Sequence, residues 1–96
     1  MQYLVLTSLD AAAPSDVVLA GLESEHQQVR ELYGASVLRQ IWRREDRRGA
    51  VLLFEVTSET EVSSYPEKLP LALAGAVKVY LLVPLGPHAA LAGNAN

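Results

Sequence analysis

The chain has no cysteine among its 96 residues. Neither a disulfide nor a thiolate metal site can therefore form, and nothing requires an oxidising compartment. Only two histidines are present, His26 and His88, which is a weak constellation for a metal ion. A basic surface is also lacking, because the formal net charge is -3 and the sequence pI is about 5.2. Since phosphate contacts need a net or local basic surface, we expect no nucleic-acid partner.

Long apolar runs are missing as well. The richest, LALAGAVKVYLLV, is broken by Gly75 and Lys78 and falls short of the roughly 18 to 20 residues that span a bilayer. The first residues lack the positive charge of a secretory signal and alternate like a strand. We therefore expect a soluble, cytoplasmic protein with no membrane partner.

Several catalytic motifs are absent from the sequence. It carries no glycine-rich phosphate loop, no Ser-His-Asp order and no metal-ligand spacing. Phosphoryl transfer, triad hydrolysis and metal catalysis are therefore poor candidates, and we expect neither a cofactor nor a metal.

What the sequence does contain is a regular succession of strand and helix patterns. Residues 2–9 are rich in β-branched and aromatic residues, which predicts a first strand. Helical spacing of apolar residues predicts a helix over about 15–33, with Ser15 as its cap and Gly34 as its end. The runs ASVLRQIWRRED and GAVLLFEVT flank a charged segment and predict an antiparallel hairpin.

The second half repeats the pattern of helix and strand. Ser58 and Glu61 fit a capping box that opens a second helix. Because proline removes an amide donor and makes the preceding residue extended, Pro66 predicts that this helix is short and followed by a loop. AVKVYLLV predicts the last strand, and residues 85–96 are expected to form a tail.

This order predicts a ferredoxin-like βαββαβ fold of the α+β class over residues 1–84, with helices on one face of a four-stranded antiparallel sheet. The strands VLLF and YLLV are apolar at consecutive positions, which indicates burial on both faces. A single copy of this fold covers only one face, so the pattern predicts a homodimer that packs sheet against sheet.

The first candidate site residues lie on the predicted helix. Glu25 falls between Leu22 and Val29, near the centre of the apolar stripe, so its carboxylate faces the sheet. A buried charge must reach a cation, take a proton or line a cavity. The alternatives are a structural salt bridge or a helix rotated toward solvent. His26, at the edge of the stripe, is a proton shuttle beside this carboxylate or a plain surface residue.

The second group lies on the strand LRQIWR. Strand alternation places Arg39, Ile41 and Arg43 on one side and Leu38, Gln40, Trp42 and Arg44 on the other. Arg39 suits a planar carboxylate held by two parallel hydrogen bonds, or else an ion pair with Glu25. Trp42 fits core or dimer packing better than a ligand platform. The charges that follow, Glu45 to Arg48, are typical of a solvated hairpin end, and we assign them no chemistry.

LRQIWRRED, followed by VLLFEVTSETEV and KLPLAL, resembles the muconolactone delta-isomerase family, in which an R-x-[LI]-W-R strand precedes a helix that ends in Leu-Pro-Leu. VPLGPH resembles the family's ending but arrives a few residues late, which suggests an insertion around 72–76. The resemblance implies a dimeric α/β barrel, with dimers gathered into larger rings such as a decamer. It also implies a proton shift in an unsaturated lactone that carries a carboxylate.

The resemblance also implies roles for individual residues. Glu25 matches a helix glutamate of the family and would be catalytic with His26, which stands where characterised members commonly have lysine. Arg39, Arg43 and Trp42 match the strand arginines and the tryptophan and would bind the small carboxylate or lactone. Two other functions remain open: a cyclisation or rearrangement on the same fold, and a non-catalytic ligand-binding oligomer in which Glu25 and Arg39 neutralise each other.

Overall fold

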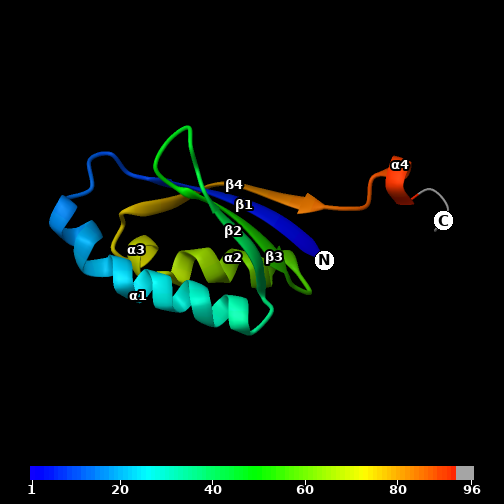
Figure 1. The fold of residues 1–96 in the computed structure, drawn as a ribbon, viewed down its shortest axis with the longest axis horizontal. Helices are drawn as coiled ribbons and strands as arrows, with labels where there is room; N and C mark the ends of the chain where they lie inside the picture. The colour runs from blue at the N-terminus through cyan, green and yellow to red at the C-terminus, as the bar shows by residue number, and fades with distance from the viewer. Residues whose placement is uncertain (93–96) are drawn as a thin grey trace.

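A computed structural model describes residues 1–92 of the chain. Its elements follow the predicted order, with two short helices in addition: β1 (Gln2–Leu9), α1 (Ser15–Gly34), β2 (Leu38–Arg43), β3 (Ala50–Glu55), α2 (Glu59–Lys68), α3 (Pro70–Leu73), β4 (Val77–Leu85) and α4 (Ala89–Ala92). The four strands pair antiparallel in the order β2-β3-β1-β4. Helices α1, α2 and α3 lie on one face of this sheet (Figure 1). The ferredoxin-like α+β prediction is confirmed.

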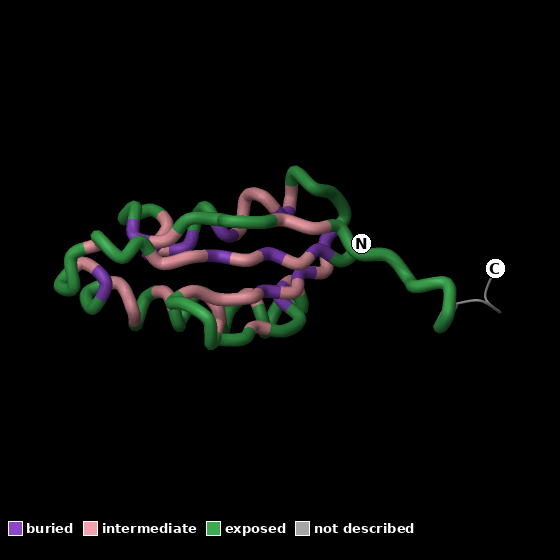
Figure 2. Tube along the Cα trace, turned by 90° about the horizontal axis from the view of Figure 1, so that it is seen from above, coloured by how far each residue is buried: buried purple, intermediate pink, exposed green. Residues whose placement is uncertain are grey.

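The main core lies between the sheet and its helices. Tyr3 and Val5 of β1 are buried and pair in register with Phe54 and Leu52 of β3, because alternate residues of paired strands share a face. Figure 2 shows the resulting alternation of buried and less buried positions along the central strands. The cluster consists of Tyr3, Val5, Leu38, Leu52, Phe54, Val56 and Val62.

Helix α1 begins and ends close to the predicted positions, but its cap is different. The N-cap is Pro14, in an extended conformation, and no side chain caps the first turn, so the prediction that Ser15 is the cap was wrong. Ser15 is instead the first helical residue. Asp16 still supplies the negative charge that the positive end of the helix dipole favours.

The capping box that opens α2 is present in a modified form. Ser58 Oγ accepts a hydrogen bond from the Glu61 amide at 3.1 Å, as the motif predicts. The Glu61 carboxylate accepts the Thr57 amide at 2.9 Å and the Thr57 hydroxyl at 2.6 Å, one residue before the usual partner. These hydrogen bonds lower the pKa of Glu61.

The second helix is interrupted later than predicted. Pro66 is buried inside α2, which continues to Lys68. The interruption falls at Leu69, whose backbone is extended (φ -65°, ψ 143°), because the following Pro70 disfavours the helical conformation at its predecessor. The position predicted for the interruption was therefore wrong, and Pro70 opens the short helix α3.

Strand β2 departs from simple alternation. The register with β3 shifts between Leu38 and Gln40, so that Leu38 and Ile41 both lie on the face that packs against the helices. Arg39 is the extra residue at this irregularity. Strict alternation predicted Leu38 and Ile41 on opposite sides of the strand, and this was wrong because the bulge resets the alternation.

The sheet face opposite the helices carries apolar side chains that the single chain leaves partly exposed. Leu4 is in register with Leu53 and Val83, and Leu6 with Val51 and Leu81. We call these six residues the open sheet face. Trp42 pairs with Val51 and lies on the same side, with 48 % of its surface exposed. The prediction of apolar residues on both faces is thus met, while the partner that would cover them remains a prediction.

The C-terminal part leaves the body of the domain. Strand β4 runs to Leu85, and α4 lies beyond it, away from the sheet and the other helices (Figure 1). The expected tail, 85–96, thus begins at the end of a strand, and residues 93–96 of it lie outside the described residues. None of the helices in residues 1–92 has the length and apolar character needed to cross a membrane.

Candidate functional site

An open pocket of about 880 Å³ lies between α1, the β2–β3 loop and the adjoining ends of β1 and β4. Helix α1 contributes Glu25, His26 and apolar residues, while the loop contributes charged residues. Its lining consists of Thr7, Leu9, Val18, Leu22, Glu25, His26, Val29, Ile41, Arg43, Arg44, Glu45, Asp46, Arg47, Arg48, Gly49, Ala50, Leu71 and Val77. A second cavity of about 30 Å³ shares Glu25 and extends toward Pro66 and Leu69.

Glu25 links α1 to the start of α3. Its Oε1 accepts a hydrogen bond from the buried amide of Leu71 at 3.0 Å. Burial raises the pKa of Glu25, while this hydrogen bond and the nearby His26 charge lower the pKa in part. Glu25 is therefore both a structural acceptor and a carboxyl group with a raised pKa that lines the large pocket.

His26 follows Glu25 on α1 and is exposed to solvent. It lines the same pocket, so the structure brings the two helix candidates together. A carboxylate and an imidazole side by side on a pocket wall are groups that can take and return protons.

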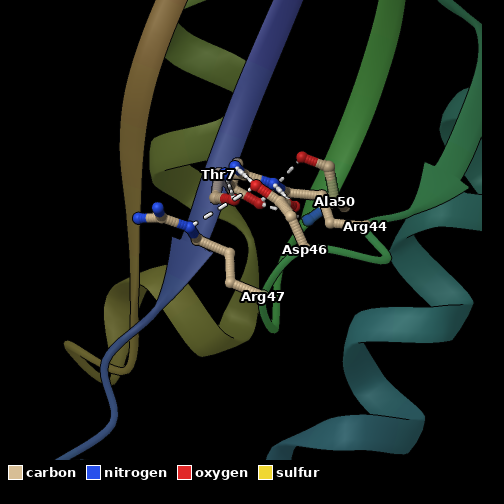
Figure 3. A network of polar contacts seen from close by, with 5 residues as sticks. All are labelled: Thr7, Arg44, Asp46, Arg47 and Ala50. Carbon is tan, nitrogen blue, oxygen red and sulfur yellow. Dashed lines mark hydrogen bonds and ion pairs between the residues drawn. The ribbon is translucent and has the colours of Figure 1, made fainter.

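The β2–β3 loop is fastened to the sheet by Arg44, whose side chain is only 7 % exposed. Its guanidinium donates to the Thr7 carbonyl at 3.2 Å and makes two hydrogen bonds to the Asp46 carboxylate, at 2.9 and 2.7 Å (Figure 3). This pairing raises the pKa of Arg44 and lowers the pKa of Asp46. Arg47 approaches the same carboxylate at 3.7 Å, and both arginines lie near the Tyr80 ring.

Backbone contacts hold the end of this loop. The Leu9 amide donates to the Arg48 carbonyl at 2.9 Å, and the Arg44 amide donates to the Gly49 carbonyl at 3.1 Å. Gly49 has φ +152°, and a Cβ atom there would lie 2.2 Å from the Thr7 carbonyl oxygen. Only glycine permits so close an approach. The loop, expected to be a solvated hairpin end, is thus a fixed wall of the pocket.

Of the three candidate site residues on strand β2, only one lines the pocket. Arg43 lines the pocket, although its side chain is 82 % exposed and pairs with Glu45 at 3.1 Å. Arg39 is exposed and lines neither cavity. Trp42 lies on the open side of the sheet, away from Glu25. Within residues 1–92, Arg39 forms no ion pair with Glu25, so the hypothesis that they neutralise each other in the core was wrong.

Sequence reasoning missed the pocket-lining role of Arg44, Asp46 and Arg48. The local signal, a charged run at a turn, is the same for a solvated loop and for a wall held by contacts with a distant strand. Across residues 1–92, no group of three or more histidine, cysteine, aspartate or glutamate residues is arranged to hold a metal ion.

Comparisons with known proteins agree with this fold. The sequence profile described as muconolactone delta-isomerase matches residues 1–90. The crystal structure of a muconolactone isomerase superposes with a TM-score of 0.74 at 18% identity, covering 92% of this chain and 91% of that one. A 5-chloro-2-hydroxyhydroquinone dehydrochlorinase from Burkholderia phenoliruptrix AC1100, in complex with 2,5-dihydroxybenzoquinone, gives a TM-score of 0.68 at 15% identity, covering 92% and 96%. No curated protein matches the sequence.

Proposed function

Because this chain belongs to the muconolactone delta-isomerase family, we propose that it is a cofactor-free isomerase that shifts a proton within a small unsaturated lactone carrying a carboxylate. The observation that supports this most directly is Glu25, a carboxyl group with a raised pKa at the wall of a large pocket. Perturbed carboxyl groups in clefts are candidates for proton transfer. A volume of about 880 Å³ is in the range of small-molecule sites.

In the proposed reaction Glu25 is the general base. It removes a proton from a ring carbon, and the electron pair of that C–H bond moves into the conjugated lactone carbonyl as a dienolate. The protonated Glu25 then returns the proton to a different carbon, so that the double bond moves and no atom is gained or lost. A pKa closer to neutrality makes a carboxylate a better base, and such a base typically contributes about 10² to 10⁴ in rate.

The other candidate site residues have different proposed roles. His26, exposed beside Glu25, relays protons between the carboxyl group and solvent. Arg43 adds positive charge to the pocket wall. Arg39 and Trp42 lie outside the pocket, and for them we propose contact with a second copy of the chain rather than with substrate.

We further propose that two copies pair through the open sheet face. Trp42 lies beside Val51 at the edge of its six apolar residues, and burying this surface against a second sheet removes from water what one chain leaves exposed. From the resemblance to the family we also propose that the dimers assemble into rings such as a decamer. We propose further that the enzyme is cytoplasmic.

The test is proton exchange followed by NMR. Muconolactone is incubated with the protein in D₂O, and deuterium incorporation and double-bond position are recorded over time. Glu25→Gln should slow both by about 10² to 10⁴. The matched control is Glu23→Gln on the same helix, because Glu23 is exposed and pairs with Arg30 outside the pocket. If Glu25→Gln exchanges protons as fast as Glu23→Gln, then Glu25 is not the base.

A further inference from the structure

The charges around the large pocket are unequally paired. The last residue of β2 and the β2–β3 loop together place four arginines on the pocket lining but only two carboxylates. Arg43 pairs with Glu45 at 3.1 Å, and Asp46 is shared by Arg44 and by Arg47 at 3.7 Å. The remaining loop arginine is Arg48.

Arg48 is the cation of this loop with free hydrogen-bonding capacity. In the part of the chain that the structure describes, its guanidinium has neither an ion pair nor a hydrogen bond, although the residue lines the pocket. A guanidinium presents a planar fork of donors that matches the two oxygens of a carboxylate. The same pocket is lined by Glu25, whose charged form is disfavoured by burial. Among the described residues, the pocket lining therefore offers an anionic ligand one cation that no carboxylate of the protein neutralises.

The position of Arg48 is fixed although its side chain is exposed. Its own carbonyl accepts the Leu9 amide, and the next residue, Gly49, packs closely against the Thr7 carbonyl. Arg44 binds that carbonyl from the other end of the loop. The side chain of Arg48 thus extends from a backbone held by β1. Ligand binding therefore costs less backbone conformational entropy than it would in a mobile loop.

We propose that Arg48 binds the carboxylate of the substrate and thereby holds the lactone in the pocket that Glu25 lines. This inference rests on the proposed function and names a residue that neither strand pattern nor family resemblance indicated. It assigns to Arg48 the task expected of Arg39. Arg44 acts through the loop backbone and is a positioning residue. The ligand class that follows is a small cyclic compound with one anionic group, whose apolar ring faces Leu22, Val29 and Ile41.

The test compares muconolactone with its methyl ester, which keeps the ring and removes the charge. Binding is measured by calorimetry at low and high salt for the wild-type protein, Arg48→Gln and Arg39→Gln. Arg39→Gln is the matched control, because Arg39 is an exposed arginine outside the pocket. Arg48→Gln should weaken binding of the acid about tenfold, because a charge-assisted bond at an exposed site is partly screened. Binding of the ester should be nearly unchanged, and Arg39→Gln should bind both as the wild type does.

Kinetics give a second measurement and separate this proposal from the proposed function. Arg48→Gln should raise KM for the acid with little change in kcat, because the carboxylate is bound equally before and during the reaction. If the acid and ester bind alike to the wild type, or if only Arg39→Gln weakens binding of the acid, the inference is overturned. Arg48-dependent binding without proton exchange would support this inference and refute the isomerase. Proton exchange that needs Glu25 but not Arg48 would support the isomerase and overturn this inference.

Discussion

The hydrogen bond from Leu71 to Glu25 gives a prediction that separates the structural role of Glu25 from its chemistry. Glu25→Ala removes the acceptor and leaves the buried Leu71 amide without a protein partner. Loss of a helix cap or of one partner of a buried hydrogen bond typically costs about 1–2 kcal/mol. For a domain of 96 residues this corresponds to a fall in Tm of about 5–10 °C. Glu25→Gln keeps an acceptor oxygen and should stay within about 0.5 kcal/mol of the wild type near pH 5.

The same pair of variants has a defined pH dependence. Burial raises the pKa of Glu25 above its ordinary value of 4.5. The folded state therefore holds this proton at pH values where the unfolded state has released it, and stability falls as pH rises from about 4.5 through the raised pKa. Glu25→Gln cannot titrate, so its stability relative to the wild type should increase across this window and level off above it.

The assay is urea unfolding of the wild type, Glu25→Ala and Glu25→Gln from pH 4 to pH 8 at one protein concentration, because assembly also stabilises the folded state. Equal stability of Glu25→Ala and Glu25→Gln would show that the capping bond contributes nothing. A constant difference between Glu25→Gln and the wild type at all pH values would refute the raised pKa.

Two further predictions concern the loop and the open sheet face. Gly49→Ala should destabilise the protein by about 1–3 kcal/mol in urea unfolding, because the new Cβ atom would meet the Thr7 carbonyl. The control Gly34→Ala should have no such effect, because there is open space around Gly34. Equal destabilisation by the two variants would contradict the close approach at Gly49. Leu53→Glu should convert the proposed dimer to a monomer in analytical ultracentrifugation, while the exposed control Leu73→Glu should leave it intact. A dimer that survives Leu53→Glu would refute pairing through the open sheet face.

The order of the elements could be predicted because its signals are local. Period-two alternation defines β1, and the Ser58–Glu61 spacing defines the start of α2. The effect of Pro66 was misjudged because a proline inside a helix removes one hydrogen bond and can kink the helix without ending it, and α2 continues past Pro66 to Lys68. The extra residue at Arg39 also escaped prediction, since a bulge depends on pairing with another strand rather than on the strand's own sequence.

The candidate site was predictable only in part, for a related reason. The position of Glu25 on the apolar stripe indicated a buried carboxylate with a partner, but that partner is the Leu71 amide, 46 residues away along the chain. Arg44 likewise binds the Thr7 carbonyl, which is 37 residues distant. Helical periodicity specifies which way a side chain points, whereas its partner is decided by how distant segments pack.

The way the β2–β3 loop is fastened has a consequence for how this protein can change over evolution. The groups of β1 that hold the loop are the Thr7 carbonyl and the Leu9 amide, which belong to the main chain and persist when side chains vary. Substitutions at Glu45, Arg47 or Arg48 can therefore alter the charge that a ligand meets while Arg44 and Gly49 keep the loop in place. With the role proposed for Arg48, ligand preference and the attachment of the loop would depend on different residues of the same six-residue turn, so selection could change one and keep the other.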